Sequence, residues 1–159
     1  DVKGDEGNDT IYGGAGDDIL DGDQGNDTIY GEAGDDYLEG NEGNDKLVGG
    51  AGKDSFKAGS GDDIIDAGSG RDWIQTGDGS DLIVIRQGEG IVGGDVDHLT
   101  DFTDGVDLIA LDGLDYSDLL FTDVSGRVMV HSGTENFMYI DGIDIADLTE
   151  ADFITYEIV

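Results

Sequence analysis

Aspartate recurs at every ninth residue through the first half of this 159-residue chain. Nine aspartates keep the spacing without an insertion or a deletion, and they are Asp9, Asp18, Asp27, Asp36, Asp45, Asp54, Asp63, Asp72 and Asp81. Each follows a glycine by two residues and precedes a large apolar residue by two. Carboxylates among the backbone carbonyls of flexible, glycine-rich turns offer only oxygen ligands, which select hard cations. Calcium fits better than magnesium, because calcium tolerates variable geometry whereas magnesium requires a near-ideal octahedron.

The aspartates belong to nine consecutive nine-residue units that run from Gly4 to Val84. In each unit the first six positions hold mostly glycine, small and acidic residues typical of turns, and the last three alternate around one apolar residue. Such alternation is typical of a very short strand, which is stable only when it stacks on others. The apolar residues, at position eight, are Ile11, Leu20, Ile29, Leu38, Leu47, Phe56, Ile65, Ile74 and Ile83.

Alternate units resemble each other more closely than adjacent units do. Tyr12 and Tyr30 are 18 residues apart, and so are Lys53 and Arg71. The structural repeat is therefore 18 residues, with two strands and two turns in each coil. The sequence predicts an all-β fold, a parallel β-roll in which two facing sheets enclose the position-eight side chains and adjacent coils lie about 4.8 Å apart.

The charge of the chain makes counter-ions necessary. Acidic residues number 39 and basic residues 7, for a net charge of −32, which excludes nucleic-acid binding and attraction to anionic membranes. Equivalent aspartates about 5 Å apart on successive coils would repel by roughly 3 kcal/mol at an effective dielectric of about 20. Residues 1–84 hold 22 acids against 5 bases. We therefore predict calcium ions between equivalent turns of successive coils, up to about seven in all.

Residues that would support catalysis are missing from the sequence. There is no cysteine, so thiolate metal sites and disulfides are excluded. The two histidines, His98 and His131, show no HExxH spacing, and no GxSxG elbow or phosphate-binding loop occurs. No stretch is apolar enough to span a bilayer. We expect no catalytic residues, no organic cofactor and no membrane insertion in this segment, which is therefore not expected to be an enzyme.

The nine-residue period ends at Ile85. Leu82–Arg86 completes the roll, and further short strands are predicted at His98–Phe102, Leu108–Leu111, Leu119–Asp123, Arg127–His131 and Phe137–Ile140. Turns are predicted at Thr103–Gly105, Ser125–Gly126 and Ser132–Gly133. Thr149 and Asp152 predict a capping box and a helical turn through Phe153. We expect two domains, the roll at 1–84 and a β-rich segment at 85–159 that caps its open end.

The units from Gly4 to Val84 resemble the GGxGxDxUx nonapeptides of RTX (repeats-in-toxin) proteins. Ala58, Ala67 and Thr76 depart from that pattern, because they replace the first glycine. The resemblance implies a right-handed β-roll that binds calcium between turns, at the C-terminal end of a larger bacterial protein that is secreted or held at the cell surface. It also implies export by a type I secretion apparatus. The acids would keep the chain unfolded in a low-calcium cytosol, and calcium binding outside would fold it.

The flanks extend this resemblance. Asp1–Lys3 fits the end of a preceding unit, so we expect the natural polypeptide to continue upstream. The segment from Asp97 to Leu114 resembles the stretch that often follows the last RTX repeat, and its Asp97, Asp101 and Asp107 are either further calcium ligands or solvated turn residues. Glu157–Val159, an acidic residue followed by apolar ones, is similar to the uncleaved signal of type I secretion substrates.

Two features leave alternatives open. Lys53 and Arg71 occupy position five one coil apart, where they either weaken the ion row or simply face solvent. Outward aromatic stripes, which include Tyr30, Tyr37 and Trp73, either bind a glycan or stiffen the sheets by cross-strand packing. The alternatives to a calcium-dependent secretion module are therefore an adhesive or glycan-binding module of a bacterial adhesin, and the non-catalytic tail of a secreted protease, lipase or polysaccharide-modifying enzyme.

Overall fold

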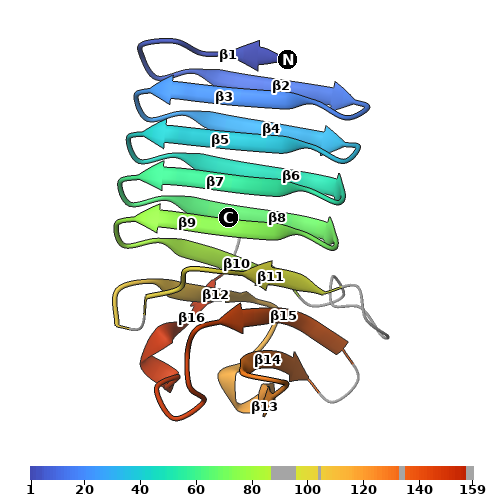
Figure 1. The fold of residues 1–159 in the computed structure, drawn as a ribbon, viewed down its shortest axis with the longest axis vertical. Coiled ribbons are helices and arrows are strands. Elements are labelled where there is room, and N and C mark those ends of the chain that lie inside the picture. Colours follow the sequence, from blue (N-terminus) through green and yellow to red (C-terminus); the bar gives the residue numbers. More distant parts are fainter. Residues whose placement is uncertain (87–95, 104, 133–134, 157–159) are drawn as a thin grey trace.

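The chain winds into a β-solenoid along the long axis of the molecule, and a smaller β-rich cap closes one end (Figure 1). The computed structural model describes residues 1–86, 96–103, 105–132 and 135–156. The all-β roll predicted from the repeat is confirmed. The predicted secretion signal at Glu157–Val159 lies outside the described residues, as do parts of the turns predicted at Thr103–Gly105 and Ser132–Gly133.

Ten strands form the roll and alternate between two parallel sheets. Sheet A takes the odd-numbered strands, which are β1 (Val2–Lys3), β3 (Ile19–Gln24), β5 (Tyr37–Glu42), β7 (Ser55–Ser60) and β9 (Trp73–Asp78). Sheet B takes the even-numbered strands, which are β2 (Thr10–Ala15), β4 (Thr28–Ala33), β6 (Lys46–Gly52), β8 (Ile64–Gly70) and β10 (Leu82–Arg86).

The strands of the roll are longer than the sequence predicted. β4 runs from position seven of one unit to position three of the next, so the turn is confined to positions four to six. The expected six-residue turn is wrong, because glycine-rich composition does not by itself distinguish a turn from a paired strand. Positions two and three instead continue the parallel pairing, as Glu32 with Gly50 and Ala33 with Ala51 show. Pairing with the equivalent positions of the adjacent coils outweighs the low intrinsic strand propensity of glycine.

The pairing register and the core agree with the predicted 18-residue coil. Ile11 pairs with Ile29, and Leu38 pairs with Phe56. Every position-eight side chain is buried, most of them completely, so one large apolar side chain per unit lies between the sheets, joined in the last three units by the smaller Ala58, Ala67 and Thr76. Val2 pairs with Leu20, which places it in the position-eight register as predicted.

Glycine at position four is required by backbone geometry. Gly25 and Gly43 have φ angles of 135° and 131°, which L side chains rarely adopt. A Cβ atom on Gly43 would also overlap the carbonyl oxygen of Gly25 in the preceding coil. The invariance of this position within the repeat therefore follows from stacking at the spacing of paired strands.

The cap extends both sheets. Sheet A continues through β11 (Asp97–Leu99) and β15 (Glu135–Asp141) to the antiparallel strands β14 (Arg127–Ser132) and β13 (Leu120–Asp123), while sheet B continues through β12 (Leu108–Asp112) to β16 (Phe153–Tyr156). Two 3-10 helices, η1 (Tyr116–Asp118) and η2 (Glu150–Asp152), lie between strands. Hydrogen bonding runs across residue 85, because β10 pairs with both β8 and β12.

Most of the cap elements were predicted. β12, β13, β14 and β15 lie where strands were expected, with bounds that differ by one or two residues, and Thr149 forms the predicted capping box with Asp152. The strand expected at His98–Phe102 is shorter, because β11 ends at Leu99. Helix η1 and strand β16 were not predicted, since neither is marked by a repeat or a turn signal.

Candidate metal centre

The turns of the roll form two rows, one along each edge. The first turn row carries the repeated aspartates Asp9, Asp27, Asp45, Asp63 and Asp81, and the second carries Asp18, Asp36, Asp54 and Asp72. Each of them immediately precedes a strand. Its backbone carbonyl accepts a hydrogen bond from the first residue of the equivalent strand in the next coil, as Asp9 does from Thr28. The structure thus brings the nine predicted residues together as two linear arrays rather than as one cluster.

From Asp27 to Asp81, one oxygen of each repeated carboxylate is fixed by the preceding coil. The backbone N–H of Asp9 donates to Oδ1 of Asp27 at 2.8 Å, and the N–H of Asp45 donates to Oδ1 of Asp63 at 2.7 Å. The same bond recurs along both rows. We call this series the carboxylate ladder. It holds these seven carboxylates in one orientation.

The other carboxylate oxygen is buried with no hydrogen-bond partner among the described residues. This holds for Oδ2 of Asp9, Asp27, Asp36, Asp45, Asp54, Asp63, Asp72 and Asp81. A Cβ atom on Gly31 would lie 2.6 Å from Oδ2 of Asp36 and 2.7 Å from the carbonyl oxygen of Gly49. The orphaned oxygen therefore faces a space that it shares with a backbone carbonyl of the next coil. A buried carboxylate beside a carbonyl, with no donor, is costly unless a cation joins them.

The electrostatics of the rows agree with that conclusion. Burial raises the pKa of Asp54 and Asp81 to about 6, and that of Asp63 to about 7. Burial, together with the neighbouring Asp97 carboxylate, raises the pKa of Asp72 to about 8. The ionised form that a cation needs is thus destabilised in the metal-free fold.

The site must draw on backbone oxygens. No group of three or more acidic or histidine side chains gathers within the described ranges in a way that would hold a metal. One carboxylate oxygen and several carbonyls remain as ligands at each turn, which is a set that suits a hard cation with a high coordination number. The residues present therefore fit calcium.

Position five carries a second hydrogen-bond series that the sequence reasoning missed. The N–H of Asn26 donates to Oδ1 of Asn8 at 2.9 Å, and the N–H of Asp35 donates to Oδ1 of Asp17 at 3.0 Å. The signal was present in the sequence, since Asn and Asp dominate position five and both offer this acceptor. Lys53 cannot accept such a bond, so the series in the second turn row ends there.

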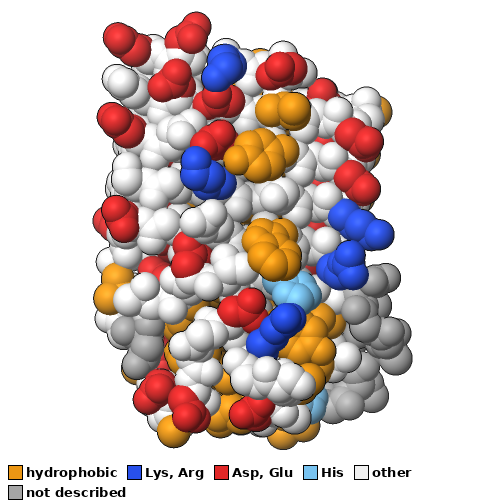
Figure 2. Space-filling model, in the orientation of Figure 1, with side chains coloured by type: hydrophobic (Ala, Val, Ile, Leu, Met, Phe, Trp, Pro, Cys, Tyr) orange, Lys and Arg blue, Asp and Glu red, His pale blue; other side chains and the backbone are white. Residues whose placement is uncertain are grey.

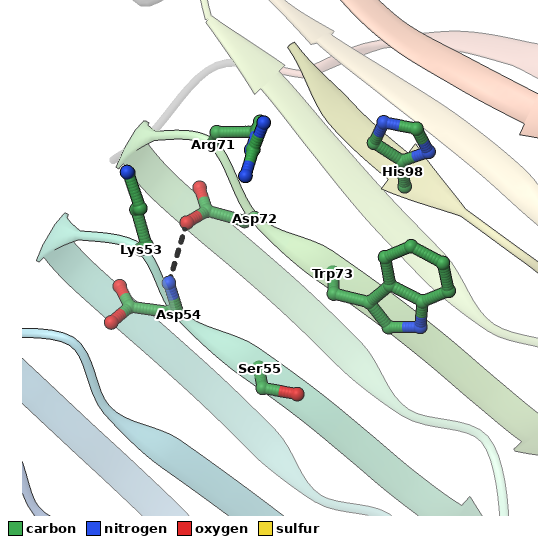
Figure 3. Close-up of a pocket in the computed structure, with 7 residues that line it drawn as sticks. All are labelled: Lys53, Asp54, Ser55, Arg71, Asp72, Trp73 and His98. Atoms are coloured by element: carbon green, nitrogen blue, oxygen red, sulfur yellow. Dashed lines mark hydrogen bonds between the residues drawn. The ribbon is translucent and has the colours of Figure 1, made fainter. Parts of the chain in front are cut away.

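Lys53 and Arg71 leave the carboxylate ladder intact. Both side chains are exposed. Between them the N–H of Asp54 still donates to Oδ1 of Asp72 at 2.8 Å, which Figure 3 shows. The geometry of the neighbouring carboxylates is therefore the same here as in the other coils.

The cap continues both rows. The N–H of Asp72 donates to Oδ1 of Asp97, and the N–H of Asp81 donates to Oδ1 of Asp107, each at 3.0 Å. Oδ2 of Asp107 differs from its equivalents in the roll, because it accepts the N–H of Thr103 at 2.8 Å. Asp101 leaves the rows and accepts the N–H and the hydroxyl of Thr76.

The repeat region matches the model of a known protein family. A family model described as the RTX calcium-binding nonapeptide repeat (4 copies) matches residues 1–29, 22–56 and 57–89, which together exceed half of the chain. A search of curated proteins found no significant match. No helix in the described part of the chain is long and apolar enough to cross a membrane.

Among solved structures, the chain is similar to the AlgE6R2 subunit of the mannuronan C5-epimerase from Azotobacter vinelandii. The two share 22% sequence identity with a TM-score of 0.57, over 83% of this chain and 93% of that one, which shows a common fold. The extracellular lipase LipA from Serratia marcescens is 16% identical, with a TM-score of 0.39, over 95% of this chain and 39% of the lipase.

Proposed function

This chain belongs to the family of RTX calcium-binding nonapeptide repeat proteins, and from that premise we propose that it is a non-catalytic, calcium-dependent module of a larger secreted bacterial protein. In this proposal the nine repeated aspartates are the metal ligands, with backbone carbonyls of the adjacent coils. Bound calcium would supply the positive charge that offsets the buried carboxylates.

The eight orphaned Oδ2 atoms carry the proposal. These Oδ2 atoms have no donor within the described residues. From Asp27 onward, Oδ1 of the same carboxylate accepts a backbone N–H of the carboxylate ladder. A chance defect would not repeat at the same atom in eight of the nine units. The regularity supports one ion between equivalent turns of successive coils, up to about seven in the roll.

The same observation supports folding that is coupled to calcium. Before metal binds, folding buries carboxylates that repel one another and lack donors. Because the binding site exists only in the folded roll, the free energy of binding contributes to the free energy of folding. A chain that stays unfolded at cytosolic calcium and folds at about millimolar calcium outside suits export through a type I apparatus.

Circular dichroism and calorimetric titration with calcium test the proposal. We expect the full chain to lose most of its β-sheet signal in excess chelator and to regain it with several calcium ions bound per chain. Magnesium at the same concentration is the control and should restore much less. A chain that is as folded in excess chelator as in calcium would contradict the proposal.

The secretion role has a separate test. The chain, fused behind an inert passenger, should be exported from cells that carry a type I apparatus and retained in cells that lack it. Equal retention in both strains would reject the role in secretion and leave calcium-coupled folding untouched.

A further inference from the structure

The outer face of sheet A carries a column of rings along the solenoid axis. Strand pairing aligns its members in the order Ile19, Tyr37, Ser55, Trp73, His98 and Tyr139, and we call this series the ring column. Figure 2 shows hydrophobic side chains down the middle of this face, with Lys and Arg side chains on both sides. Trp73 is 52% exposed, so its ring is available to a ligand.

Ser55 interrupts the ring column and leaves a hollow. Its side chain stands between Tyr37 and Trp73 in the register but is much shorter than either. The hollow measures about 390 Å³, which lies within the range of small-ligand sites. Figure 3 shows Lys53 and Arg71 on one side of it and the rings of Trp73 and His98 on the other.

The ring side of the hollow is flat and supported from behind. The Trp73 and His98 rings stack with centroids 5.3 Å apart and an interplanar angle of 9°, and Tyr139 packs against His98 at 5.3 Å. A flat, rigid aromatic surface of this kind suits the C–H face of a pyranose ring.

The other side of the hollow carries two cations, Lys53 and Arg71, beside the carboxylates of Asp54 and Asp72 in the second turn row. Lys53 and Arg71 are two of only seven basic residues in the chain. Lys3, Lys57 and Arg127 each form an ion pair with an acidic residue of the neighbouring strand, whereas no ion pair of Lys53 is found within the described ranges. Two adjacent cations, one with a planar guanidinium fork, form a receptor for a carboxylate.

We propose that this hollow binds a uronate residue of an acidic polysaccharide, with the sugar ring on Trp73 and His98 and the carboxylate held by Lys53 and Arg71. An acidic peptide offers the charge but lacks the rigid ring that would cover the aromatic pair. The inference goes beyond the proposed function, because calcium-coupled folding uses Asp54 and Asp72 at the edge of the hollow but needs neither its rings nor its two cations.

Trp73 gives a direct readout, because it is the only tryptophan in the chain. The full chain, kept folded at a buffered free calcium concentration, is titrated with tetragalacturonate while tryptophan fluorescence is followed. We expect a saturable change with tetragalacturonate, and binding at least about tenfold weaker for the fully methyl-esterified tetramer, which keeps the rings and removes the charge. A polyglutamate peptide is the third ligand and should produce no saturable change.

Three variants decide which residues are responsible. Ser55→Tyr fills the hollow with a side chain that the column already holds at Tyr37, and it should abolish binding. The double variant Lys53→Gln/Arg71→Gln should weaken binding at least about tenfold. Lys57→Gln, which removes a paired cation on the same sheet, is the matched control and should bind as the original chain does. Circular dichroism in calcium confirms that each variant is folded.

The outcomes are separable. Binding that is lost in Ser55→Tyr and in the double variant, and kept in Lys57→Gln, supports the proposal. No response of the folded original chain to tetragalacturonate overturns it. Equal response to the esterified tetramer or to polyglutamate overturns the recognition of an acidic sugar, and equal binding by all variants overturns the location.

Discussion

The roll and the cap differ in the hydrogen bonding of their buried aspartate carboxylates. In the roll, Oδ2 of Asp63 and of its equivalents is buried without a donor. In the cap, Oδ2 of Asp107 accepts the N–H of Thr103, and Oδ2 of Asp152 accepts both the N–H and the hydroxyl of Thr149. Asp107 and Asp152 of the cap thus have donors for Oδ2, whereas the described residues of the roll offer none to eight of its repeated aspartates.

The two regions also differ in how they bury apolar surface. The roll contributes one large core side chain per nine-residue unit and few smaller ones, so its apolar core is thin. The cap packs several rings together, because Tyr116, Phe121 and Phe153 lie in mutual contact with centroids 5.2–5.9 Å apart. We infer that metal dependence is concentrated in the roll and that ordinary packing stabilises the cap.

Removal of calcium by a chelator should produce the largest difference in stability between the roll and the cap. In excess chelator we expect amide hydrogens of the roll strands, such as those of β4 and β6, to lose protection from exchange by several orders of magnitude. Amides of the antiparallel pair β14 and β15 should lose much less. Hydrogen exchange followed by mass spectrometry, with magnesium as the control cation, measures both. Equal loss in the two regions would contradict the comparison.

Acid should partly replace calcium in the roll. The pKa values of Asp54, Asp63, Asp72 and Asp81 are raised in the fold above the ordinary value near 4. A raised folded-state pKa contributes stability that is present below the unfolded-state value and is lost as pH rises through the folded-state value. The metal-free chain should therefore become less folded as pH rises from about 4 to about 8.

Circular dichroism in chelator at constant ionic strength measures this pH dependence. With calcium present the trend should reverse, because metal ligands must be deprotonated. A metal-free signal that is constant over this pH range would show that the buried carboxylates do not oppose folding.

Glycine substitutions should distinguish stacked turns from free ones. Gly43→Ala places a Cβ atom against the carbonyl oxygen of Gly25 at a positive φ, so we expect a loss of at least about 3 kcal/mol in calcium. Gly126 in the cap also has a positive φ, of 85°, but nothing lies near its Cβ position. Gly126→Ala should cost only about 1 kcal/mol. Urea denaturation in calcium compares the two, and similar losses would argue against the close stacking of the turns.

Neutralising one carboxylate in each region should produce effects of different sign. Asp63→Asn keeps the Oδ1 acceptor of the ladder and removes a buried charge. It should weaken calcium binding and remove about one ion from the stoichiometry, yet make the metal-free chain more stable. Asp152→Asn loses an acceptor of the capping box and should cost about 1 kcal/mol with or without calcium.

Calorimetric titration and urea denaturation test this pair of variants. The decisive result is the metal-free comparison, since a destabilised Asp63→Asn chain in chelator would mean that the carboxylate has a partner in the fold other than a cation.

The repeat explains why so much of the roll was predictable. Any residue of a strict 18-residue coil has its own equivalent as neighbour, so Ile29 must lie between Ile11 and Leu47 once the period is read. The nine aspartates, their two rows and the buried position-eight residues followed in the same way. The strand lengths did not follow, because glycine-rich positions pair as strands only when an identical coil lies beside them.

In the cap and on the surface the sequence was less informative. Asp97 and Asp107 join the carboxylate rows through contacts 25 and 26 residues away, where no period links them to Asp72 and Asp81. The sequence indicated the residues of the hollow only one by one, with Lys53 and Arg71 as unusual cations at position five and Trp73 as part of an aromatic stripe. Their convergence around Ser55 was not predictable, because it depends on which position lacks a large side chain in a column that crosses six strands.

The sequence by itself determined the coil, its register, its core and the identity of the acidic residue in every turn, because these depend only on period and on residue type. Tertiary structure decided which oxygen of the ladder carboxylates accepts a hydrogen bond and which is buried without a donor. It also decided where the rows end and where the ring column opens. Those properties depend on donors supplied by neighbouring coils and by the cap, and a donor acts only over the length of a hydrogen bond.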